Sequence, residues 1–78
     1  MFTNKADNGR NNICGTQVAH YRKLSGKSQR ALADALQLSG LDIDKNAIQR
    51  IECGKRFVTD IELKAFSEIL NVGIEELL

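Results

Sequence analysis

Residues 45–56 read KNAIQRIECGKR, and this stretch decides the fold of the chain. At about 100° per residue, a helix over residues 45–53 gathers its apolar side chains on one side. These are Ala47, Ile48 and Ile51. The opposite side carries two cations and two amides, Lys45, Asn46, Gln49 and Arg50, with Cys53 among them. The stretch therefore predicts an amphipathic helix with one face toward a core and a polar face outward.

Capping residues indicate where this helix and the helices before it begin and end. Asp44 is a good N-cap for it, and Gly54 is a C-terminal signal. Ser28 can cap a preceding helix, whose apolar face is Leu32, Ala33 and Leu36. An earlier helix begins near Ile13, and its apolar line continues through Cys14, Val18 and Tyr21.

The helix that follows has the clearest start signal in the chain. Thr59 and Glu62 form a capping box, and Val58 with Leu63 has the spacing of a hydrophobic staple. Its expected buried line is Leu63, Phe66, Ile69 and Leu70. A last short helix is expected over residues 74–78. The sequence therefore predicts one all-α domain of five short helices over residues 13–78, preceded by a flexible polar arm over residues 1–12.

The charge is divided unequally, although the net value over 78 residues is only +1. Residues 1–58 hold ten basic and five acidic side chains, a balance of +5. Residues 59–78 hold one lysine and five acidic side chains, a balance of −4. This division indicates that one end meets a polyanion while the other does different work, although two solvated faces would show the same pattern.

Composition excludes membrane-spanning and secreted disulfide-rich proteins. No apolar run approaches the ~18 residues that a membrane helix needs, and the N-terminal residues lack the apolar stretch of a secretory signal. The two cysteines are expected to be reduced thiols in the cytoplasm. His20, the one histidine, has no convergent nucleophile or carboxylate, and Cys14, Cys53 and His20 lack metal-ligand spacing. We therefore expect no enzyme, no metal and no cofactor.

The polar face of the helix over residues 45–53 suits DNA. Amides make paired hydrogen bonds to adenine, and cations bind guanine or phosphate. An ordinary solvated face would look the same, and the spacing alone favours that interpretation. Just beyond Gly54, the charges of Lys55 and Arg56 and the neighbouring backbone N–H groups could hold a phosphate.

A buried ion pair is expected between two helices. Arg22 lies four residues after Val18, on the apolar line of the first helix, and Glu52 borders Ile48 and Ile51. A charge carried toward a core needs a partner, because an unpaired buried charge costs several kcal/mol. The spacing therefore predicts an Arg22–Glu52 pair.

These residues together resemble a known family. Arg22, Ser28-Gln29, Leu32-Ala33, Leu36 and the run from Ile48 through Glu52 to Arg56 resemble the phage repressor and Cro family of helix-turn-helix proteins. The resemblance implies that the helix over residues 45–53 enters the major groove of DNA. It implies base contacts by Lys45, Asn46 and Arg50, with Gln49 adjacent. It also implies that Gln29 bonds a phosphate and braces this helix, and that a phosphate is clamped by Gly54, Lys55 and Arg56.

The chain departs from that family at one place. Residues 37–43 form a connection too long for a compact turn, so either the second helix is longer or an ordered loop stands beside it. Asp44, at the start of the helix over residues 45–53, would stand near DNA phosphates. It either caps that helix or accepts from a cytosine amino group.

The N-terminal arm carries two cations, Lys5 and Arg10. They either reach along a groove of the DNA or make no contact with it.

The leading interpretation is a sequence-specific double-stranded DNA-binding regulator that represses by occupying an operator. The alternative is a protein-interaction module, for instance an antitoxin that neutralises a protein partner.

The acidic C-terminal region is expected to form a homodimer contact. Its apolar residues are Val72, Ile74, Leu77 and Leu78, although a monomer could pack all of them internally. Cys14 is expected to be packed, and Cys53 to be accessible in the free protein and shielded by DNA.

Overall fold

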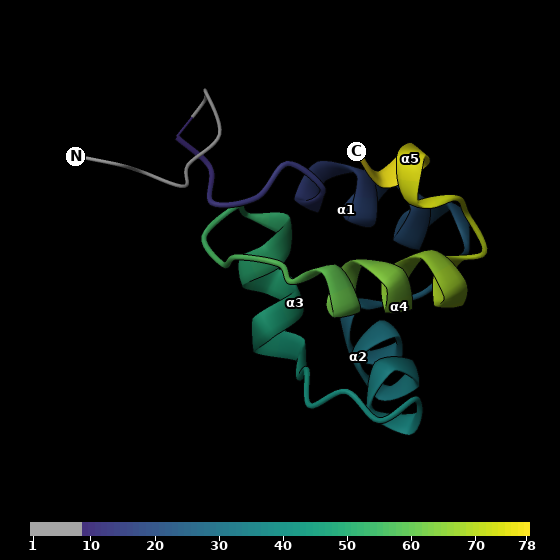
Figure 1. Ribbon diagram of the computed structural model, residues 1–78. Coiled ribbons are helices and arrows are strands. Elements are labelled where there is room, and N and C mark those ends of the chain that lie inside the picture. Colours follow the sequence, from purple (N-terminus) through teal and green to yellow (C-terminus); the bar gives the residue numbers. More distant parts are fainter. Residues whose placement is uncertain (1–8) are drawn as a thin grey trace.

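The structure is a computed structural model that describes residues 9–78. Its five helices are α1 (Gly15–Leu24), α2 (Gln29–Leu38), α3 (Lys45–Glu52), α4 (Asp60–Leu70) and α5 (Ile74–Leu77) (Figure 1). The predicted all-α fold is confirmed, since residues 9–78 contain helices and no strand. Each of these helices is also too short or too polar to cross a lipid bilayer.

The predicted helix starts are present as hydrogen bonds. Ser28 Oγ accepts from the Ala31 N–H at 3.0 Å, and Asp44 Oδ1 accepts from the Ala47 N–H at 2.8 Å. The capping box at the start of α4 is complete, with Thr59 as its N-cap residue. The first helix differs, because α1 begins at Gly15 and leaves Ile13 outside it and exposed.

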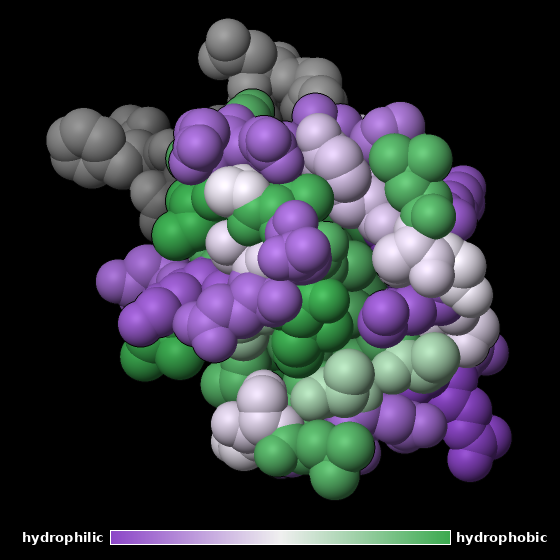
Figure 2. Space-filling view, turned by 90° about the vertical axis from the view of Figure 1, so that its right-hand side faces the viewer, coloured by the Kyte–Doolittle hydropathy of each residue, from purple (hydrophilic) through white to green (hydrophobic). Residues whose placement is uncertain are grey.

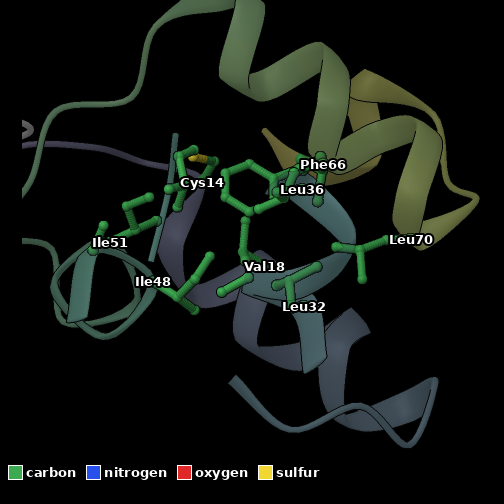
Figure 3. Close-up of a cluster of buried hydrophobic side chains, with 12 residues drawn as sticks. Cys14, Val18, Leu32, Leu36, Ile48, Ile51, Phe66 and Leu70 are labelled. Atoms are coloured by element: carbon green, nitrogen blue, oxygen red, sulfur yellow. The ribbon is translucent and has the colours of Figure 1, made fainter. Parts of the chain in front are cut away.

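The core lies where four helices meet. The side chains of α4, Phe66 and Leu70, pack with those of three other helices (Figure 3). These come from α1 (Cys14 at its N-cap and Val18), α2 (Leu32 and Leu36) and α3 (Ile48 and Ile51). The Phe66 ring, fully buried, lies in the middle of this cluster. Because α3 contributes its apolar face to the cluster, its polar face is turned to solvent.

The long connection forms an ordered loop. Helix α2 ends at Leu38, and the chain then turns through Gly40, whose φ of +102° is a backbone conformation that favours glycine. The Ile43 side chain is buried, and Gln37 Nε2 donates to the Ile43 carbonyl at 3.1 Å. The loop is therefore attached to the core at the entry to α3, and Asp42 and Asp44 remain exposed.

The segment before α1 corrects the boundary of the flexible arm. Asn12 is buried, and the side chains of residues 10–12 hydrogen-bond to backbone carbonyls at the end of α3. The sequence prediction failed here because these bonds cross about 40 positions of the chain, and no local pattern indicates such partners. Lys5 and the rest of residues 1–8 lie outside the described residues.

The C-terminal apolar residues divide into packed and exposed ones. Leu77 is fully buried and Val72 packs against the core, whereas Ile74 is 38% exposed and Leu78 is 61% exposed. Helix α5 and the end of α4 lie on the side of the molecule away from α3 (Figure 1). Figure 2 shows this side, on which apolar surface gathers between polar side chains.

Candidate nucleic-acid interface

The outward face of α3 is an uninterrupted polar surface. Its exposed side chains are Lys45, Asn46, Gln49 and Arg50. Its inward residues Ala47, Ile48 and Ile51 are buried. The ordered loop before α3 leaves these four polar side chains uncovered. The structure therefore brings together two amides and two cations on one side of a helix anchored in the core, a set that suits hydrogen bonding to base edges.

The predicted ion pair holds the C-terminal end of α3. Arg22 Nε lies 2.7 Å from Glu52 Oε2, and Arg22 Nη2 donates to Glu52 Oε1 at 3.2 Å. About a tenth of each side chain is exposed. Arg22 Nη1 also donates to the Lys27 carbonyl at 2.9 Å. This bidentate pair joins α1 to α3, as the spacing of the apolar residues predicts.

Gln29 lies against the same carboxylate. Its Nε2 donates to Glu52 Oε1 at 3.0 Å, so the first residue of α2 is attached to the last residue of α3. Glu52 thereby accepts hydrogen bonds from two other helices. The bracing of α3 by Gln29 that the family resemblance implies is therefore present as a hydrogen bond.

The turn after α3 engages the backbone of Gly54 within the protein. Gly54 is buried, its N–H donates to the Ile51 carbonyl at 3.0 Å, and its carbonyl accepts from the Asn11 N–H at 2.7 Å. The Lys55 N–H is also engaged, with the Arg50 carbonyl at 2.8 Å. The N–H and carbonyl of Gly54 therefore both have partners within the protein, and its φ of +81° serves the end of the helix.

Arg56 is engaged with α4. Its Nη1 and Nη2 donate to the two carboxylate oxygens of Glu62, each at 3.1 Å. Burial alone would raise the pKa of Glu62, but the hydrogen bonds from Arg56 and from Thr59 outweigh it and hold that pKa below its ordinary value. Lys55, by contrast, is an exposed cation beside α3.

The two thiols lie as the sequence predicts. Cys53 is exposed at the C-cap of α3, and Cys14 is buried in the core, where desolvation raises the pKa of its thiol. His20 is exposed and packs edge-on against Tyr21, with ring centroids 5.0 Å apart. No group of side chains in residues 9–78 is arranged to hold a metal ion.

Sequence reasoning missed the residues that close the end of α3. Arg10, Asn11 and Asn12 donate to backbone carbonyls of Ile51 and of the residues that follow it. One signal was available: Asn12 Oδ1 accepts from the Gly15 N–H, three residues on. The bond spans three residues, as at Ser28 and Asp44, although the N-cap of α1 is Cys14 and Asn12 lies two residues before it.

These features define a class of protein. A short helix braced on the preceding helix, with its polar face outward from a five-helix core, is a helix-turn-helix DNA-binding unit. The Helix-turn-helix family model matches residues 18–77, and the chain belongs to this family of DNA-binding transcription regulators. The resemblance to phage repressors is thereby confirmed.

A solved structure is similar to the chain over most of its length. It is the crystal structure of the restriction-modification controller protein C.AhdI from Aeromonas hydrophila. The sequence identity is 28% and the TM-score is 0.71, over 83% of this chain and 87% of that chain. A search of curated proteins gave no match.

Proposed function

We propose that this protein is a transcriptional repressor that recognises a specific duplex DNA sequence through α3 and acts by occupying an operator. The observation that carries the proposal is the outward face of α3, where four exposed polar side chains stand on a helix whose other face is buried. The protein acts in the cytoplasm, where the unpaired thiols of Cys14 and Cys53 stay reduced.

The four side chains divide the work of reading bases. Asn46 and Gln49 can each make a pair of hydrogen bonds to adenine, and Lys45 and Arg50 can bind the O6 and N7 atoms of guanine. Lys45 and Asn46 lie in the first turn of α3 and Arg50 in its last, so the face offers contacts along its whole length.

Phosphate contacts come from side chains beside the helix. Lys55 is an exposed cation just after α3. The Gln29 amide nitrogen has two hydrogens and gives one to Glu52, so the other suits a phosphate oxygen. Arg56 keeps 29% of its side chain exposed beside Glu62, which makes it a weaker candidate than Lys55.

We place a two-fold contact at the acidic C-terminal region, away from α3. Ile74 and Leu78 expose apolar surface there, and the negative charge of residues 59–78 is unsuited to DNA. The face in Figure 2 includes α5 and the end of α4. A dimer of this kind reads two half-sites about 34 Å apart, so its operator is palindromic.

The test combines selection of DNA from a random pool with two variants. We expect a palindromic consensus for the native protein and a lost preference at one base position for Asn46→Ala. Lys55→Ala should weaken all sequences alike and lower the salt slope by about 1. Lys64→Ala, which removes an exposed lysine from α4, serves as the control for charge alone. Identical binding profiles for Asn46→Ala and Lys55→Ala would contradict the proposed division, and failure to select any duplex would overturn the function.

A further inference from the structure

Residues 10–12, which we call the strap, run beside the C-terminal end of α3 before the chain enters α1 (Figure 1). They lie outside the segment matched by the family, which starts at residue 18. No residue of the strap belongs to the base-reading face of α3, and the function proposed above assigns the strap no role. Its contacts nevertheless concentrate on the turn that carries Lys55.

Asn12 makes the most extensive contacts of the strap. Its side-chain oxygen accepts from the Gly15 N–H at 2.8 Å. Its side-chain nitrogen donates to the Ile51 carbonyl at 3.0 Å and to the Arg56 carbonyl at 2.7 Å. The residue is only 9% exposed, so these bonds are largely shielded from water. One amide therefore joins the start of α1, the last turn of α3 and the turn beyond it.

The neighbouring strap residues hold the carbonyls in between. Arg10 Nη2 donates to the Glu52 carbonyl at 2.8 Å, and Asn11 Nδ2 donates to the Lys55 carbonyl at 2.9 Å. Carbonyls at a helix C-terminus lack helical partners, and a cation there also interacts favourably with the helix dipole. The strap thus supplies side-chain donors for the carbonyls of Ile51 and Glu52 at the C-terminus of α3.

Two glycines permit this close approach. A Cβ at Gly54 would meet the Arg10 guanidinium carbon at 2.6 Å, and a Cβ at Gly15 would overlap the Ile51 carbonyl oxygen. At Gly15 the clash is with backbone, so a side chain there would require a shift of the chain, whereas at Gly54 a side chain would displace the Arg10 guanidinium. The C-terminal end of α3 has a second attachment, because the Glu52 carboxylate accepts hydrogen bonds from Arg22 and Gln29.

We propose that the strap is a positioning device for DNA binding, with Asn12 as a positioning residue that touches no DNA itself. The strap holds the carbonyl of Lys55 itself and those of Glu52 and Arg56 before and after it. It thereby sets where the Lys55 ammonium meets the phosphate backbone of the DNA. This inference rests on the proposed function. Without the Asn12 amide, the turn samples other conformations and the Lys55 contact is made for only part of the time.

The experiment is a double-mutant cycle between Asn12→Ala and Lys55→Ala, measured as DNA affinity against salt concentration. Loss of one phosphate contact corresponds to about a fivefold weaker affinity at 0.15 M salt and a slope lower by about 0.9. We expect Asn12→Ala to show most of this loss of affinity and most of this decrease in salt slope, although the substitution removes no charge. The double variant should bind no more weakly than Lys55→Ala alone, because Asn12 acts through Lys55. A purely structural role leaves the salt slope unchanged.

Ser67→Ala is the matched control, because it removes a side-chain bond to the Val72 carbonyl at the end of α4, far along the chain from the strap. Its folded fraction should bind as the native protein does. If the native protein binds DNA but folded Asn12→Ala keeps the native slope, the strap proposal is overturned and the proposed function stands. If the native protein binds no duplex, both are overturned. Should Asn12→Ala fail to fold, Asn11→Ala, which removes the exposed bond to Lys55, decides by the same slope and coupling.

Discussion

The two ends of α3 are held in different ways. At its N-terminus, Asp44 caps the helix through the Ala47 N–H, and Gln37 holds the Ile43 carbonyl, so the partners lie three and six residues apart. At its C-terminus, Glu52 pairs with Arg22, 30 residues away, and the Ile51 carbonyl accepts from Asn12, 39 residues away.

The C-terminal end of α3 depends on the packing of the whole domain, whereas the N-terminal end depends on local hydrogen bonds. The N-terminal bonds form as soon as the local turn forms, so they contribute the ordinary energy of an exposed cap. The C-terminal bonds form only when α1, α2 and the strap have packed around α3. The buried charges there also make the loss of one partner more costly than the loss of a cap.

The largest expected effect comes from breaking the C-terminal end. Glu52→Ala leaves the Arg22 guanidinium buried without its carboxylate and removes the acceptor for Gln29. We expect the free energy of unfolding to fall by roughly 3 kcal/mol, the scale for removing one partner of a buried pair. Urea denaturation followed by circular dichroism measures it as a lower midpoint.

Glu68→Ala is the matched control for this substitution. Glu68 is an exposed carboxylate on α4, and its removal should change the free energy of unfolding by no more than about 0.5 kcal/mol. An unchanged midpoint for Glu52→Ala would show that the ion pair contributes nothing, and the contrast between the two ends of α3 would be lost.

Breaking the N-terminal end should have a smaller effect. Asp44→Ala removes the N-cap of α3 and should cost about 1 kcal/mol. Asp44→Asn keeps a side-chain oxygen for the Ala47 N–H and should restore most of the loss in the same denaturation experiment. If Asp44→Ala proved as destabilising as Glu52→Ala, the local end would not be the weaker one.

The same contrast explains what could be predicted from the sequence. Helix starts at Ser28, Asp44 and Thr59 were predictable because each cap bonds an N–H only three residues on. The Arg22–Glu52 pair was predictable because a charge on an apolar helix face needs an opposite charge nearby. The polar face of α3 followed from helical periodicity alone.

What could not be predicted are contacts that depend on how helices are placed. Nothing near Asn12 indicates that its amide meets Ile51 and Arg56, and nothing near Gly54 indicates that Arg10 covers it. Arg56 was predicted to hold a phosphate, yet the pairing with Glu62 depends on where α4 begins after the turn. Residue type predicts a hydrogen-bonding group, and only the tertiary structure supplies its partner.

The smallest expected effect on stability comes from the pair between Arg56 and Glu62, which joins the turn after α3 to α4. Glu62 joins the turn after α3 to the cap of α4, and its pKa is lower when folded than its ordinary value of 4.5. A lowered folded pKa stabilises the protein above the unfolded pKa, and this contribution is lost as the pH falls through the folded pKa. Glu62→Gln should therefore cost less than about 1 kcal/mol at pH 7, a value typical of partly exposed pairs.

The measurement is the difference in free energy of unfolding between the native protein and Glu62→Gln, taken from pH 7 down to pH 3. We expect the difference in free energy of unfolding to be constant above about pH 5 and to shrink toward zero as Glu62 becomes protonated. Glu68→Gln, which replaces an exposed carboxylate on α4, serves as the control. A difference that stayed the same at pH 3 would mean that the charge of Glu62 contributes nothing to its pairing with Arg56.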